Sequence, residues 1–143
     1  MNLEQILELW KEDCNIDQEQ LGSESLKIPK LHHKYYEIYA QECRKLKFMI
    51  EEHKNLKLLK YEFYTIGPDE STPKDWRLPP RGMILKSEVQ MYMDADRQII
   101  ESNLKISLQQ QKVDTLEDII KSIMTRNFII KNGIDWNKFT NGG

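Results

Sequence analysis

The stretch PKLHHKYYEIYAQECRKLKFMIEEHKNLKLLKYEFYTI, residues 29–66, decides the fold. It has no internal glycine or proline, and its apolar and aromatic residues recur every three or four positions, as on one face of an α-helix. With a rise of about 1.5 Å per residue, an uninterrupted helix of this length extends on the order of 50 Å, longer than an ordinary globular domain is wide. We therefore expect it to pack against other long helices, in the same chain or in neighbouring copies.

The segments on either side of this helix predict a short helix and two loops. Residues 3–10 have the pattern of an amphipathic helix, residues 22–25 that of a loop, and Pro29 suits the first turn of the long helix. The proline-rich stretch over residues 67–82 cannot continue a helix and indicates a long loop. Its Trp76 could touch a ligand, but burial of the large ring against the nearest helix is the favoured interpretation.

The second half of the chain predicts two further helices. One spans residues 85–112, and the other starts at a cap near Asp114 and stops at Gly133, before a last turn over residues 134–139. One line of the first of these helices repeats every seven residues: Tyr92, Ile99, Ile106 and Val113. The adjacent line is mostly polar: Val89, Asp96, Asn103 and Gln110. If the polar members lie in a seam between packed helices, they restrict the register and the number of helices that pair. The alternative is that they face water.

These patterns predict an all-α protein. No stretch shows convincing strand alternation, and a chain of 143 residues fits one domain. We expect a long helical hairpin of coiled-coil-like helices with short N- and C-terminal helices. Residues 1–66 would hold the N-terminal and long basic helices, residues 67–83 the proline-rich loop, and residues 84–143 the C-terminal helices.

The composition limits the classes of function. Charged residues make up 31% of the chain and the mean hydropathy is −0.67, as expected for helices with narrow apolar seams. The net charge of −2 argues against a generally basic nucleic-acid binder, so any such binding must use a local patch or one repeated around an oligomer. The chain has no apolar run long enough for a membrane span, and its cysteines are Cys14 and Cys43. We expect a soluble, intracellular protein with reduced thiols.

A local patch of this kind is present on the long helix. The face opposite its apolar residues is basic, and residues 57–64, KLLKYEFY, interleave cations with aromatic rings. Cations release counterions from a phosphate backbone, and flat rings offer unstacked bases a stacking surface. A solvated charged face, with Tyr and Phe turned into a core, is the alternative and is favoured by these residues alone.

Other chemistries lack a motif. The metal-ligand candidates His32, His33, His53, Cys14 and Cys43 do not fall in a metal-binding spacing. The sequence also contains no glycine-rich phosphate loop and no nucleophile elbow. We therefore predict a protein that is not an enzyme, with no catalytic residues, no metal and no cofactor.

Taken together, the residues resemble the UvsY family, the recombination mediator proteins of T-even-like bacteriophages. The resemblance runs nearly end to end and is clearest in the ungapped C-terminal part, through IMTRNFIIKNGIDWNKF at residues 123–139. The positions that carry it, besides the basic helix, are Asp13, Ile16, Asp17, Ala95, Asp96, Arg97, Arg126, Phe128, Ile130, Lys131 and Phe139. The resemblance implies a largely helical, non-catalytic protein that forms a ring-shaped homo-oligomer, a hexamer or heptamer.

The resemblance also implies partners. UvsY-like proteins bind single-stranded DNA, contact the phage single-strand-binding protein, and load the phage RecA-like recombinase onto coated strands during recombination, repair and replication. Their place of action is the cytoplasm of the infected bacterial host. From the residues alone, a helical scaffold or adaptor that binds only protein is the alternative function.

Site residues follow from the same resemblance. The family's DNA-binding segment, Lys-x-Arg-aliphatic-acidic-aromatic-aromatic, matches residues 58–64; its second basic position is Lys60, whereas its first is Leu58, with Lys57 one residue earlier. The expected DNA contacts are Lys54, Lys57, Lys60, Phe63 and Tyr64, extended by Lys45 and Lys47. Phe63 and Tyr64 could either stack on bases or pack in the core. The expected oligomerisation residues are Ile99, Ile106, Val113, Leu116, Ile120, Ile123, Phe128, Trp136 and Phe139.

Overall fold

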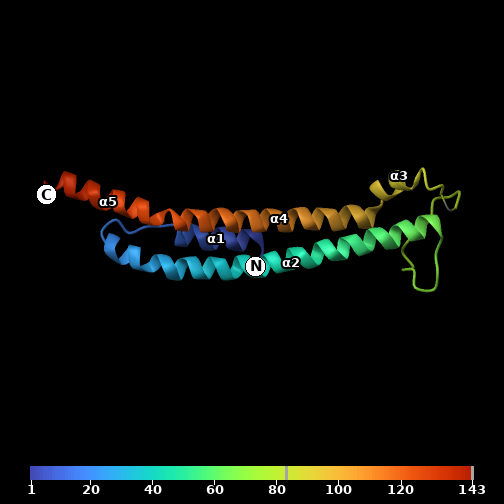
Figure 1. Cartoon of the computed structure of the whole chain (residues 1–143), viewed down its shortest axis with the longest axis horizontal. Helices are drawn as coiled ribbons and strands as arrows, with labels where there is room; N and C mark the ends of the chain where they lie inside the picture. Colours follow the sequence, from blue (N-terminus) through green and yellow to red (C-terminus); the bar gives the residue numbers. More distant parts are fainter. Residues whose placement is uncertain (83, 143) are drawn as a thin grey trace. The chain divides into compact units, whose positions relative to one another are not determined.

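The computed structural model describes residues 1–82 and 84–142, and all of the regular structure in these ranges is helical. The helices are α1 (Leu3–Asp13), α2 (Leu21–Thr65), α3 (Val89–Asp94), α4 (Arg97–Met124) and α5 (Arg126–Thr140) (Figure 1). The expected all-α class is confirmed. Within the described ranges no helix is both long and apolar enough to cross a membrane.

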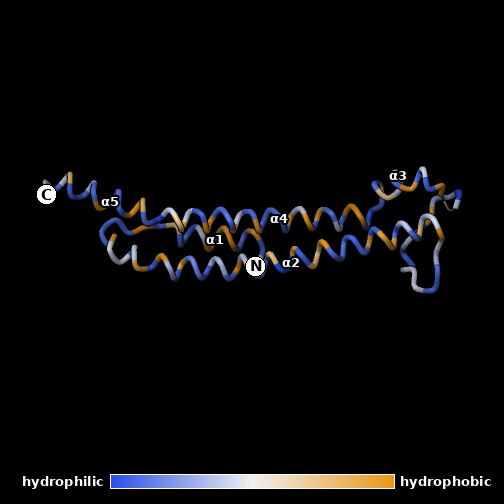
Figure 2. The backbone as a smooth tube through the Cα atoms, viewed as in Figure 1, coloured by the Kyte–Doolittle hydropathy of each residue, from blue (hydrophilic) through white to orange (hydrophobic). Residues whose placement is uncertain are grey.

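The helices divide into two compact units, and the two longest helices contribute to both. Unit 1 comprises Met1–Arg44 with Gln110–Gly143, and unit 2 comprises Lys45–Gln109. Apolar positions recur at helical spacing along α2 and α4 between hydrophilic ones (Figure 2). Each unit has its own cluster of buried apolar residues.

The core of unit 1 joins α1, the first half of α2 and the second half of α4. Its buried members are Ile6, Tyr35, Leu116, Ile119, Ile120 and Ile123. The ring of Trp10 meets the ring of Tyr35 edge-on at 5.5 Å between centroids. In the same unit, the buried carboxylate of Glu42 lies 3.3 Å from the ammonium of Lys112. Cys14 and Cys43, both in this unit, are free thiols.

Helix α2 begins at Leu21, so the expected loop over residues 22–25 is wrong and Pro29 lies inside the helix. A tertiary contact outweighs these local loop signals. Glu24 in the first turn is buried, and its carboxylate lies 3.3 Å from the buried guanidinium of Arg126. The same guanidinium donates to the carbonyl oxygens of Asp13 at 2.9 Å and Asn15 at 2.8 Å. These bonds join α5 to the α1–α2 connection and to the start of α2.

The helices in the second half of the chain also begin and end at other residues than expected. The predicted helix over residues 85–112 is interrupted at Ala95 and Asp96, and α4 then runs unbroken past Asp114, which accepts a bond from Gln110 at 2.9 Å instead of capping a helix. Helix α5 continues through Gly133. A side chain at Gly133 would meet the Leu21 side chain at 3.2 Å, so glycine here permits a close approach of α2.

The heptad line of α3 and α4 is buried or half-buried at every position: Tyr92, Ile99, Ile106 and Val113. On the adjacent line Asp96 is buried, whereas Asn103 and Gln110 are exposed. For these last two residues, the alternative that they face water is correct.

Candidate nucleic-acid interface

All of the expected DNA-contacting residues lie in unit 2, on the second half of α2, but they do not share one environment. Lys45, Lys47, Lys54 and Lys57 are exposed to solvent. By contrast, only 1% of Lys60, 4% of Phe63 and 7% of Tyr64 is exposed. The structure therefore separates the predicted set into a solvent-facing basic group and a buried group.

Two lysines of the basic group, Lys47 and Lys57, carry charge that is available to a ligand. Lys54 pairs with Glu51 at 3.1 Å, but both side chains are more than two-thirds exposed and such pairs are weak in water. Within residues 1–82 and 84–142, Lys47 and Lys57 have no ion-pair or hydrogen-bond partner. Solvated lysines of this kind can exchange their counterions for phosphates without losing an internal contact.

The buried group is organised around Lys60. Its ammonium lies 2.9 Å from Asp96 Oδ2, donates to Gln98 Oε1 at 2.8 Å, and sits 3.9 Å from the centroid of the Trp76 ring. A lysine inside a protein requires such partners, because an unpaired buried ammonium is strongly unfavourable. Lys60 is therefore fully engaged within unit 2.

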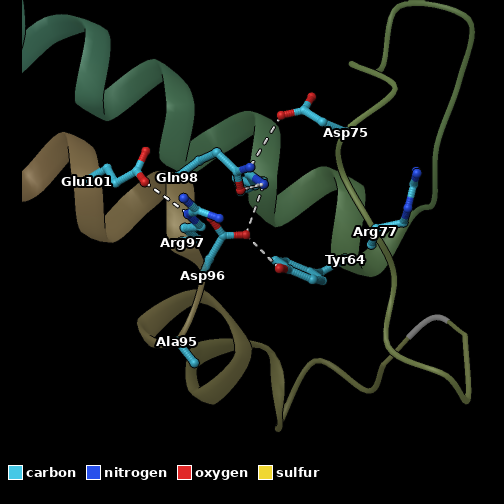
Figure 3. A pocket seen from close by; sticks show the side chains of 9 residues that line it. Tyr64, Asp75, Arg77, Ala95, Asp96, Arg97, Gln98 and Glu101 are labelled. Carbon is cyan, nitrogen blue, oxygen red and sulfur yellow. Dashed lines mark hydrogen bonds and ion pairs between the residues drawn. The ribbon is translucent and has the colours of Figure 1, made fainter.

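Asp96 is the centre of this group. It accepts a bond from the Tyr64 hydroxyl at 2.6 Å (Figure 3), and its other oxygen accepts the backbone amide of Ile99 at 3.0 Å at the start of α4. Burial alone would raise the pKa of Asp96, but the bonds from Tyr64, the Ile99 amide and Lys60 outweigh it and hold that pKa below its usual value. Burial and the neighbouring Asp96 carboxylate raise the pKa of Tyr64.

Aromatic rings pack between the buried group and the proline-rich loop. The Trp76 ring packs edge-on against Phe63 with 5.5 Å between centroids, and Phe63 in turn contacts Tyr64 at 5.3 Å. The preferred interpretation of Trp76, that it attaches the loop to the nearest helix, is confirmed. Phe63 and Tyr64 pack in the core, which was one of their two predicted environments.

A cavity of about 570 Å³ lies beside this group. The charged residues that line the cavity are three cations and three acids: Lys60, Arg77, Arg97, Asp75, Asp96 and Glu101. Arg97 is paired with Glu101 at 3.0 Å (Figure 3). A lining without net charge does not favour a phosphate. Within the described ranges no cluster of His, Cys, Asp and Glu could hold a metal ion.

The expected oligomerisation residues also differ in their exposure to solvent. Ile99, Val113, Leu116, Ile120 and Ile123 are buried within the chain, and Ile106 is half-buried. Phe128, Trp136 and Phe139 on α5 are 65%, 63% and 78% exposed. The α5 residues are thus apolar side chains that the single chain leaves uncovered.

Sequence reasoning missed Gln98 and Trp76 as partners of Lys60, and it did not separate Tyr61 from its buried aromatic neighbours. A signal for Lys60 was present, because Leu56, Lys60 and Phe63 follow the spacing of one helix face. That face is apolar, so a lysine on it requires a buried partner. The identity of the partner, Asp96, depends on the tertiary fold.

The family model described as "Recombination, repair and ssDNA binding protein UvsY" matches residues 9–143. The chain belongs to the UvsY family. None of the curated protein sequences matches this UvsY-family chain.

Crystal structures of the bacteriophage T4 recombination mediator protein UvsY share its fold. One, of lattice type IV, has a TM-score of 0.79 at 18% identity and covers 98% of this chain and 99% of that chain. Another, of lattice type II, has a TM-score of 0.80 at 20% identity and covers 99% of this chain and 98% of that chain. A third, of lattice type I, has a TM-score of 0.74 at 20% identity and covers 96% and 98% of the two chains.

Proposed function

We propose that this UvsY-family protein is a non-catalytic recombination mediator that binds single-stranded DNA through the exposed lysines of α2. The observation that carries the proposal is the solvent-facing run of Lys45, Lys47, Lys54 and Lys57 on one helix. The description of the family as single-stranded-DNA-binding supports the same ligand. Lys60, Phe63 and Tyr64 then act as positioning residues that hold this part of α2 in shape.

The charge balance of the chain agrees with weak contacts repeated over several subunits. The net charge is −2, so a single chain has little overall attraction for DNA and depends on its local lysines. For a single strand, each neutralised phosphate contributes about 0.7 to the salt slope of log affinity. Repetition of the lysine run around an oligomer would multiply this term and raise avidity without any tight single site.

We assign assembly to the exposed apolar residues Phe128, Trp136 and Phe139 of α5. Large uncovered aromatic side chains are typical of subunit contacts. In this proposal they close a ring-shaped homo-oligomer, a hexamer or heptamer. The buried residues of α4, from Ile99 to Ile123, support the ring indirectly by holding α4 against α1 and α2.

The proposed role is exchange of proteins on DNA. The oligomer would contact the phage single-strand-binding protein, weaken its hold on the strand, and load a RecA-like recombinase there, in the cytoplasm of the infected host. Many weak cationic contacts suit this role, because each can be released separately as one protein replaces another.

The proposal is tested by binding of a fluorescent oligo(dT) at several salt concentrations, with light scattering on the same sample. The variant K47A/K57A should bind more weakly and lower the salt slope by about 1.4 per subunit engaged, while the oligomer stays intact. K86A/K105A, which removes two other exposed lysines of unit 2, is the matched control. Salt-independent binding, or no binding by an assembled wild-type oligomer, would favour a protein-only adaptor instead.

A further inference from the structure

The aromatic residues at the end of α2 differ sharply in what they contact. Phe63 and Tyr64 are buried and each packs against other rings. Tyr61, between them and Lys57, is 37% exposed. Within residues 1–82 and 84–142, its side chain has no ring contact, no cation–π contact and no hydrogen bond. Tyr61 is thus a partly exposed ring whose side chain has no specific partner among the described residues.

The position of Tyr61 on α2 places it beside the basic group. Lys54, Lys57, Leu58 and Tyr61 are spaced i, i+3, i+4 and i+7, which puts them on one face of a helix. All of them are exposed. The tyrosine ring therefore lies about one helical turn beyond Lys57 and two turns beyond Lys54.

Another exposed tyrosine of the same helix provides a contrast. Tyr36 is more exposed than Tyr61, but its ring already stacks on His32 with 5.9 Å between centroids and an interplanar angle of 13°. Tyr36 lies in unit 1, outside the basic group of unit 2. Exposure, the lack of a partner and proximity to the lysines therefore coincide at Tyr61 rather than at Tyr36.

We infer that Tyr61 is a base-stacking residue of this protein and contributes to a preference for single-stranded over duplex DNA. The inference rests on the proposed binding of single-stranded DNA. Lys54 and Lys57 would hold the backbone, and an unstacked base would lie on the free face of the Tyr61 ring. Bases in a duplex are already stacked on their neighbours, so only a single strand can use the ring. Every base has a π face, so this contact favours no particular sequence.

The stacking contact is separable from the phosphate contacts by experiment. The full-length protein, wild type, Y61A, Y61F and the control Y36A, is titrated with oligo(dT), with an abasic oligonucleotide of the same length, and with a duplex. We expect Y61A to bind oligo(dT) about 5- to 150-fold more weakly for each subunit that engages the strand, the range that one aromatic–base stack provides. Its salt slope should be unchanged, because no charge is removed. Y61F keeps the ring and should bind like the wild type.

The other ligands complete the test. Y61A and the wild type should bind the abasic strand equally, and the preference of Y61A for single strand over duplex should fall by the same factor as its affinity for oligo(dT). Circular dichroism verifies that the variants remain helical. Equal binding of oligo(dT) by Y61A and the wild type would overturn the assignment of Tyr61 while leaving the lysine contacts standing. Absence of binding by the wild type would overturn the proposed function together with this inference.

Discussion

The buried ion pair between Lys60 and Asp96 leads to a quantitative prediction about stability. The variant K60M removes the ammonium but keeps an unbranched side chain that fills most of the same volume. It leaves the Asp96 carboxylate, only 3% of whose side chain is exposed, without its cation. Breaking a buried pair in this way costs about 3–5 kcal/mol. We expect K60M to lower the free energy of unfolding by about 3 kcal/mol, the low end of this range, because Asp96 keeps its bonds from Tyr64 and the Ile99 amide.

The assay is urea unfolding followed by circular dichroism at one fixed protein concentration, because assembly makes apparent stability depend on concentration. K57M, one turn earlier and exposed, is the matched control and should change the free energy of unfolding by no more than about 0.5 kcal/mol. The double variant K60M/D96N should cost less than the sum of the single variants, because the two changes remove the same interaction.

A specific result would refute this reasoning. If K60M unfolds like the wild type but lowers the salt slope of single-stranded-DNA binding by about 0.7 per subunit engaged, Lys60 is a solvated phosphate contact and not part of the core. The opposite pattern, a large loss of stability with an unchanged salt slope per bound oligomer, is the one we expect.

Three other predictions concern pH, the α1–α2 connection and assembly. The folded-state pKa of Asp96 lies below the usual 3.8, so its ionised form stabilises the protein above that pH. This stabilisation should be lost as the pH falls through the folded-state pKa. In D96N, the urea concentration at the unfolding midpoint should therefore depend less on pH over this range. R126A should lower the free energy of unfolding by about 2–4 kcal/mol and expose residues 14–20 to limited proteolysis, since Glu24 and two carbonyl groups lose a donor. F139S should lower the oligomer mass measured by light scattering at unchanged helicity, because the Phe139 side chain is exposed in the single chain.

Much of the fold could be predicted from local patterns. The apolar spacing in residues 29–66 indicated a long helix, and Ile99 and Val113 of the heptad line are buried within the single chain. The boundaries of α2 could not be predicted, because Gly22 and Pro29 are local loop or start signals. They are outweighed by the bond between Arg126 and Glu24, which are far apart in the sequence. Local propensity is a weak preference that tertiary context can override.

The candidate site could be predicted only in part, for a related reason. Sequence spacing locates lysines on a helix but does not say which of them has a buried carboxylate beside it. Lys57 and Lys60 are one turn apart and chemically identical, and yet one is exposed and the other is enclosed by Asp96, Gln98 and Trp76. The environment of each lysine is therefore a property of the whole of unit 2.

The several bonds of Asp96 have a consequence for how related sequences can diverge. One carboxylate caps the start of α4, accepts from Tyr64 and neutralises Lys60, so its loss removes all three contacts at once. A cation at position 60 is tolerable in the interior only while an acid remains at position 96. A relative that lacks the acid at position 96 should carry an apolar residue at position 60, so the two positions are expected to change together during evolution.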